Sequence, residues 1–97
     1  MIEHVIIFRA DRLSPSAESD LLGWMARLRD HAGIVGFASG KNFSDRSKRF
    51  DYCLRITFQD RDALDAYQND PAHLAFVEYR EAVTDDLICV DYEWWPR

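Results

Sequence analysis

The run from Ile2 to Phe8 constrains the fold of this chain more than any other stretch. It reads Ile-Glu-His-Val-Ile-Ile-Phe and is rich in β-branched residues, which is typical of a strand. Apolar side chains occupy both alternating sets: Ile2, Ile6 and Phe8 share one set with His4, and the other contains Val5 and Ile7. Such a strand is covered on both faces. A chain of 97 residues has too few helices to cover both faces of a sheet, so a second copy of the same sheet is the simplest cover for one of them.

Length and composition predict one globular domain over residues 1–97. A hydrophobic content of 47% and an aromatic content of 13% supply enough apolar surface to offset the entropy of ordering the chain. The net charge of −5 comes without a basic run, so we expect no nucleic-acid or membrane partner. The longest apolar run near the N-terminus, Val5 to Phe8, is far shorter than a signal or membrane segment, which favours a cytoplasmic location.

The first half of the chain reads as strand, helix, strand and strand. Ser14-Pro15 is a helix-start signal, and apolar residues then recur at helical spacing until Gly33. Ile34 to Asn42 alternates weakly and reads as an edge strand, followed by a polar connection over 43–49. Phe50 to Phe58 alternates strictly between apolar and polar residues, which predicts the clearest strand of the chain.

The second half adds two helices and a last strand. Asp60 begins a short helix through Tyr67, Asp70-Pro71 begins another, and Leu87 to Trp95 reads as the final strand. The order predicts an α+β, ferredoxin-like βαββαβ fold, with a four-stranded antiparallel sheet and its helices on one face. The other face would expose a patch of apolar residues and pair with a second copy as a two-fold homodimer. The patch comprises Val5, Ile7, Val90, Tyr92 and Trp94.

His73 is the strongest candidate for chemistry. It lies in the first turn of the helix that Asp70-Pro71 starts, where the positive end of the helix dipole disfavours the imidazolium and keeps the ring neutral. Tyr67 lies across the bend, so the two side chains form a base and a hydrogen-bond donor for a small acidic substrate. The alternative is that His73 is a capping or packing residue.

The spacing of cysteines and histidines does not indicate a metal site. Cys53 and Cys89 lie in runs that read as different strands, with no C-x-x-C pair. His31 ends the first helix, far along the chain from His4 and His73. We therefore expect free thiols, no metal and no cofactor.

Several short motifs follow one another along nearly the whole chain. They are His4-Val5-Ile6-Ile7-Phe8-Arg9, Gly40-Lys41-Asn42-Phe43-Ser44, Phe50-Asp51-Tyr52, Asp70-Pro71-Ala72-His73 with Phe76-Val77, and Val90-Asp91-Tyr92. Taken together and in this order, they resemble the stress-responsive dimeric α/β barrel (Dabb) family, which includes the olivetolic acid cyclase-like proteins.

The resemblance implies a dimeric α/β barrel that binds a small hydrophobic or aromatic ligand. In the plant polyketide cyclases of the family, a cofactor-free aldol condensation uses a histidine base and a tyrosine, which correspond to His73 and Tyr67 here. The same resemblance implies that His4 lines the pocket, together with Ile6, Phe8, Leu21, Leu22, Leu54, Ile56, Phe76 and Leu87. The function implied is either this cyclase or aldol-type chemistry, or that of a non-catalytic stress-response dimer with a structural or ligand-binding role.

Overall fold

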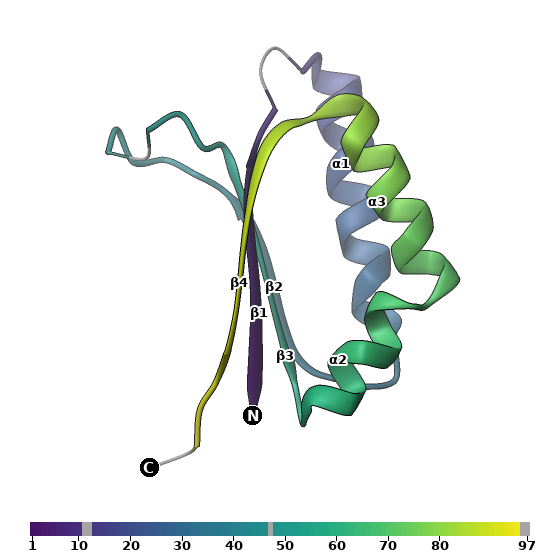
Figure 1. Cartoon of the computed structure of the whole chain (residues 1–97). Coiled ribbons are helices and arrows are strands. Elements are labelled where there is room, and N and C mark those ends of the chain that lie inside the picture. Colours follow the sequence, from purple (N-terminus) through teal and green to yellow (C-terminus); the bar gives the residue numbers. More distant parts are fainter. Residues whose placement is uncertain (11–12, 47, 96–97) are drawn as a thin grey trace.

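A computed structural model describes residues 1–10, 13–46 and 48–95. One layer of helices lies on one side of a single sheet, and the other side of the sheet is uncovered (Figure 1). In chain order the elements are β1 (Ile2–Arg9), α1 (Pro15–Arg27), the short 3-10 helix η1 (Leu28–Asp30), β2 (Ile34–Lys41), β3 (Tyr52–Phe58), α2 (Arg61–Gln68), α3 (Pro71–Val83) and β4 (Asp85–Glu93).

The sheet confirms the predicted fold class. Its four strands run in the order β2-β3-β1-β4, and every neighbouring pair is antiparallel. β1 is therefore a central strand, with Ile6 opposite Leu54 of β3 on one side and Cys89 of β4 on the other. This is the ferredoxin-like arrangement, in which the two βαβ crossovers place the helices on the same face.

The core fills the space between the sheet and the helices. Alternate residues of β1 and β3 point towards the helices, because successive side chains of a strand face opposite sides of the sheet. The largest fully buried side chains are Tyr67, Phe8, Phe58, Phe76, Leu21, Met25, Leu54 and Ile56. β1 and β3 therefore each contribute one face to the core and present the other to the uncovered side, whereas no residue of β4 is buried.

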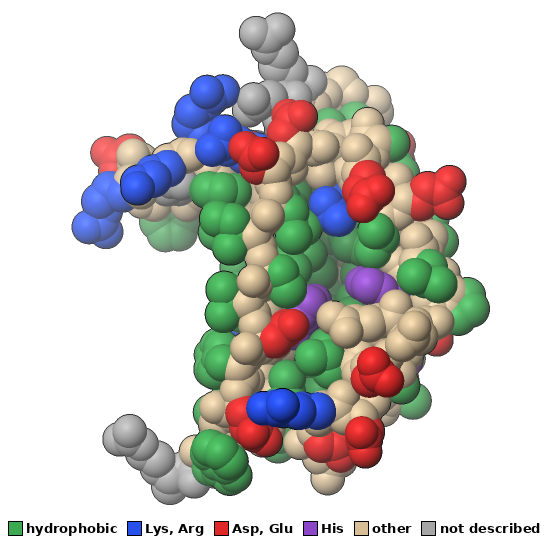
Figure 2. All heavy atoms as spheres, viewed as in Figure 1, with side chains coloured by type: hydrophobic (Ala, Val, Ile, Leu, Met, Phe, Trp, Pro, Cys, Tyr) green, Lys and Arg blue, Asp and Glu red, His purple; other side chains and the backbone are tan. Residues whose placement is uncertain are grey.

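The uncovered face of the sheet is largely apolar. Ile88, Val90 and Tyr92 of β4 are each about half exposed, and hydrophobic side chains follow this face in Figure 2. Its main polar feature is Glu3, whose buried carboxylate accepts hydrogen bonds from Arg55 Nη1 (3.1 Å), Thr57 Oγ1 (2.7 Å) and Trp94 Nε1 (3.0 Å).

The three predicted helix starts are confirmed by their caps. The side chain of Ser14 accepts a hydrogen bond from Ala17 N, and Asp60 accepts one from Ala63 N. Asp70 accepts one from Ala72 N, and Pro71 opens α3. Each cap satisfies an amide that the first helical turn leaves without a partner.

Three predicted elements differ from the structure by two residues or more at a boundary. We expected the first helix to continue to Gly33, but α1 ends at Arg27 and η1 follows, because His31 is extended and its Nδ1 accepts from Gly33 N at 3.2 Å. The last strand is Asp85–Glu93 rather than Leu87 to Trp95. Its partner β1 begins at Ile2, opposite Glu93, so the ladder has no residue left to pair with Trp95.

The third strand begins at Tyr52, two residues later than expected. Asp51 instead accepts a hydrogen bond from Ala10 N through its side chain, at 2.9 Å.

Within the described residues, none of the helices is long and apolar enough to cross a membrane.

Candidate active site

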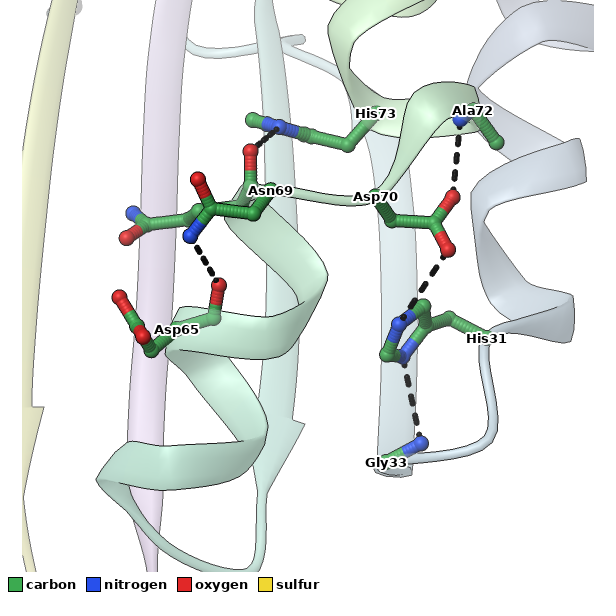
Figure 3. A network of polar contacts seen from close by, with 8 residues as sticks. His31, Gly33, Asp65, Asn69, Asp70, Ala72 and His73 are labelled. Carbon is green, nitrogen blue, oxygen red and sulfur yellow. Dashed lines mark hydrogen bonds and ion pairs between the residues drawn. The ribbon is translucent and has the colours of Figure 1, made fainter.

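The bend between α2 and α3 presents the two residues predicted to carry chemistry. Tyr67 belongs to the last turn of α2, and His73 to the first turn of α3. Asp70 between them caps α3 at 2.8 Å. Figure 3 shows His73 and Asp70 pointing to opposite sides of this connection. The cap therefore fixes the backbone from which His73 projects.

The tautomer of His73 follows from its hydrogen bond. Its Nδ1 lies 3.1 Å from the carbonyl oxygen of Gln68 (Figure 3). A carbonyl only accepts hydrogen bonds, so Nδ1 carries the proton of the neutral ring and donates it. This leaves Nε2 as the basic nitrogen, with its lone pair free to take a proton.

The pKa of His73 is lowered, as the sequence predicted, but the main cause differs. Burial is the largest contribution, since a half-buried imidazolium loses hydration. The nearby positive charges of His4 and Arg80 also lower the pKa, whereas the bond to Gln68 and the charge of Asp70 raise it. The ring is therefore neutral at pH 7.

Tyr67 lies at the centre of an aromatic cluster and is only 1% exposed. Ring centroids lie 4.5 Å away for His73, 5.1 Å for Phe58, 5.6 Å for His31 and 6.0 Å for His4. Burial raises the pKa of Tyr67 well above its usual value. The phenol therefore keeps its proton and is a hydrogen-bond donor at neutral pH.

A cavity of about 140 Å³ lies between the sheet and α3, and we call it the sheet-side cavity. Figure 2 shows histidine side chains in a hollow between the edge of the sheet and the helices. Six of the residues expected at the pocket lie together in this cavity: His73, Tyr67, His4, Ile6, Phe76 and Leu87. The remaining lining residues are Gln68, Val77, Arg80 and Cys89.

A second cavity of about 200 Å³, the α1-side cavity, opens on the other side of the same two rings. Tyr67 and His73 line both cavities and so form the wall between them. Here His31 Nε2 lies 3.8 Å from Asp70 Oδ2 (Figure 3). Arg27, Leu28, Asp30 and Ala72 complete the lining.

Five other residues expected at the pocket lie elsewhere. Phe8, Leu21, Leu54 and Ile56 are completely buried in the core and line none of these cavities. Leu22 is 38% exposed on the outer side of α1. The chain therefore fills with side chains part of the volume that the resemblance assigned to a ligand.

The site also contains three residues that sequence reasoning did not assign to it. The Arg80 side chain is 12% exposed, and it lines the sheet-side cavity about two turns beyond His73. Cys89 and Asp91 approach His4 from β4. Arg80 could have been found from the sequence, because it lies seven residues after His73 on the same helix. Cys89 and Asp91 could not, because their positions depend on the register of β1 against β4.

The largest of the three cavities lined by described residues, about 460 Å³, does not contain His73. It lies at the edge of the sheet between α2 and β4, and it shares only Gln68 with the sheet-side cavity. Its lining is rich in charged side chains, including Arg61 and Glu93, which form an ion pair at 3.6 Å. We place the candidate site at the smaller cavities because the neutral base and the phenol meet there.

The fold and the paired cavities define a ferredoxin-like α+β protein with a half-buried histidine site. The model of the Stress responsive A/B Barrel Domain family, Dabb, matches residues 2–94. The chain therefore belongs to that family.

Individual relatives agree with this assignment. An uncharacterized protein of Streptomyces coelicolor is 29% identical over 97% of this chain and 100% of its own length. A dimeric ferredoxin-like protein of unknown function from Thermobifida fusca superposes with a TM-score of 0.85 at 20% identity, covering 96% of this chain and 90% of that one. A hydroxynitrile lyase from Passiflora edulis superposes with a TM-score of 0.85 at 16% identity, covering 98% of this chain and 96% of that one. At such identities these two structures support the fold alone.

Proposed function

We propose that this protein is a homodimer that binds a small apolar or aromatic molecule and carries out aldol-type chemistry with His73 as general base, without a cofactor. The observation that carries the proposal is the position of a neutral imidazole, with Nε2 as its basic nitrogen, in a cavity that a protonated phenol also lines. The resemblance to the plant polyketide cyclases of this family, which carry out aldol-type cyclisation, is consistent with such a site.

The proposed step is proton abstraction next to a carbonyl group. Nε2 of His73 takes the proton, the C–H bond electrons form an enolate, and the imidazole becomes an imidazolium. The hydroxyl of Tyr67 donates a hydrogen bond to the developing oxyanion. Arg80 places a positive charge on the same cavity, which stabilises the same negative charge. The enolate carbon then attacks a second carbonyl, and His73 returns the proton to the product oxygen.

The cavities limit the size of the ligand. Their volumes of about 140 and 200 Å³ are below the roughly 300 Å³ at which sites for drug-sized molecules begin. Ile6, Phe76 and Leu87 supply apolar contacts in the sheet-side cavity. A compact ligand with one ring or a short chain fits this arrangement, with its carbonyl directed towards His73.

The uncovered face of the sheet supports the homodimer. Val90 is 52% exposed on it, beside Ile88 and Tyr92. Apolar patches of this kind mark interfaces on small proteins. The Thermobifida fusca neighbour is described as dimeric. Two copies of this sheet, packed face to face about a two-fold axis, would form the barrel of the family name.

Deuterium exchange tests the chemistry without knowledge of the natural substrate. The protein is incubated with phenylacetone in deuterated buffer, and exchange at the carbon next to the carbonyl is followed by proton NMR. We expect the wild type to catalyse exchange, and His73→Gln to lower the rate by about 100-fold or more with little change in thermal midpoint. As a matched control, Tyr79→Phe changes a ring that stacks on Trp24 outside both cavities, and it keeps the full rate.

The second candidate function is a non-catalytic stress-response dimer. The observation that favours it is the filling of the core by Phe8, Leu54 and Ile56, which leaves only small cavities. It predicts equal exchange rates for the wild type and His73→Gln, together with a large loss of stability in the variant because a packing residue has been removed.

A further inference from the structure

We propose that His4, Cys89 and Asp91 bind one divalent transition-metal ion of the zinc class per protomer. The cluster lies on the helix-facing side of the sheet, where β1 and β4 pair. This inference does not rest on the proposed base chemistry of His73. The spacing of the three residues along the chain gave no sign of it.

The register of the sheet brings the three side chains together. His4 pairs with Asp91 across the β1–β4 ladder, and Cys89 lies two residues before Asp91, so all three share one face. Cys89 Sγ is 3.7 Å from His4 Nδ1 and 3.8 Å from Asp91 Oδ1. His4 Nδ1 and Asp91 Oδ1 are in direct contact. All three donor atoms lie within 4.8 Å of one another.

These separations agree with those of a metal site. Tetrahedral zinc with Zn–S of about 2.3 Å and Zn–N of about 2.0 Å holds its sulfur and nitrogen ligands about 3.6 Å apart. The two sulfur distances are therefore already close to the required values. The oxygen and nitrogen are closer than a metal would hold them, so Asp91, which has a 37% exposed side chain, has to move outward slightly.

The donor types also fit this class of ion. One imidazole, one thiolate and one carboxylate form a mixed set that suits Zn²⁺ or Co²⁺, whereas Mg²⁺ and Ca²⁺ prefer oxygen ligands alone. Binding replaces the proton between His4 and Asp91 and releases the thiol proton of Cys89 to solvent.

The scaffold holds the ligands in place and leaves access to them. His4 is buried on a central strand, and strand positions are among the most rigid in a fold. His4 and Cys89 line the sheet-side cavity, and Asp91 lines the hollow at the β4 edge. Water or a ligand group from these spaces can occupy a fourth coordination position.

Cobalt binding tests the proposal on the full-length protein. After treatment with a chelator, the protein is titrated with Co²⁺, and thiolate-to-cobalt charge transfer is followed by absorption in the near ultraviolet. We expect one Co²⁺ per protomer, displaced by Zn²⁺, and a higher thermal midpoint with either ion. Absence of the charge-transfer band in the wild type would overturn the proposal.

The two cysteines provide a matched pair of variants. Cys89→Ser should abolish the band, and Asp91→Asn should weaken binding by about tenfold or more. Cys53→Ser should leave both unchanged, because Cys53 pairs with Ile7 and points to the opposite face of the sheet. A band that survives in Cys89→Ser, or is lost in Cys53→Ser, would identify adventitious binding and contradict the site.

A further variant separates this inference from the proposed function. His73→Gln should keep Co²⁺ binding, since its ring is not among the proposed ligands. Deuterium exchange measured with excess chelator should keep the wild-type rate. A protein that binds no metal would therefore contradict the metal site but not the base chemistry. A protein that catalyses no exchange would contradict the base chemistry but not the metal site.

Discussion

His73 is defined by its surroundings at the scale of single residues. Its Nδ1 is committed to the carbonyl of Gln68, and burial lowers its pKa, so the ring presents a neutral Nε2. The place of His73 in the first turn and the direction of its pKa shift could be predicted from Asp70-Pro71, but burial, the main cause of that shift, could not. The hydrogen bond to Gln68 could not, since it depends on how α2 and α3 meet at the bend, whereas the charge of Arg80 lies at i+7 on the same helix.

Removal of one hydroxyl tests the role of the phenol. Tyr67→Phe should keep the packing of the aromatic cluster but lower the deuterium-exchange rate by about 100-fold, because a donor to the oxyanion is lost. The rate is measured by NMR as for the wild type. Tyr79→Phe is the control: Tyr79 stacks on Trp24 at 5.0 Å, outside both cavities, and its variant should keep the full rate. Equal rates in the two variants would remove Tyr67 from the mechanism.

At the scale of elements, the helix caps and the strand with alternating apolar and polar residues could be predicted from the sequence. Ser14, Asp60 and Asp70 each begin a helix as expected, and Phe50 to Phe58 contains a strand. The ends of elements were less predictable. The last strand is shifted by two residues because β1 determines where the ladder ends, and the first helix stops early because His31 bonds to Gly33. The first is a tertiary effect that the local pattern does not contain, and the second is a local hydrogen bond that the spacing of apolar residues does not reveal.

Variants of two aspartate caps distinguish an effect on the stability of the fold from an effect on the pKa of His73. Asp70→Ala and Asp60→Ala should each lower the free energy of unfolding by about 1 kcal/mol, since each frees one helix-start amide. The two variants should differ in the pKa of His73. Loss of Asp70 removes a charge that raises this pKa and should lower it further, whereas loss of Asp60 should leave it unchanged.

Urea denaturation and a histidine NMR titration measure these two effects. The denaturation slope should stay constant in both variants, since neither changes the surface exposed on unfolding. An equal shift of the His73 titration in both variants would show that the cap acts only through stability.

At the scale of the whole molecule, one layer of helices covers one face of the sheet only (Figure 1). The order of the elements predicted helices on one face only, and the apolar residues in both alternating sets of β1 predicted a second cover for the other face. The sequence did not predict that Glu3 would be buried on the uncovered face by three donors, because these come from β3 and from the chain after β4.

A charge on the uncovered face tests the homodimer. Val90→Glu places carboxylates near one another across a two-fold interface, and the dissociation constant should rise by about 100-fold or more. Sedimentation velocity over a range of protein concentrations measures this change. Leu74→Glu is the matched control, since Leu74 is 55% exposed on α3, on the helix side. A wild-type monomer, or equal dissociation of both variants, would contradict the proposed interface.

The state of the His73 ring tests the central claim most directly. Nitrogen-15 NMR of histidine-labelled protein reports both the pKa and the protonated nitrogen in one titration. We predict a midpoint below the ordinary histidine value of about 6.5, with the proton of the neutral ring on Nδ1 and a free Nε2. The base should therefore be fully available at pH 7 and be lost only as the pH falls through this lowered pKa. A ring that is protonated at neutral pH, or that carries its proton on Nε2, would contradict the account.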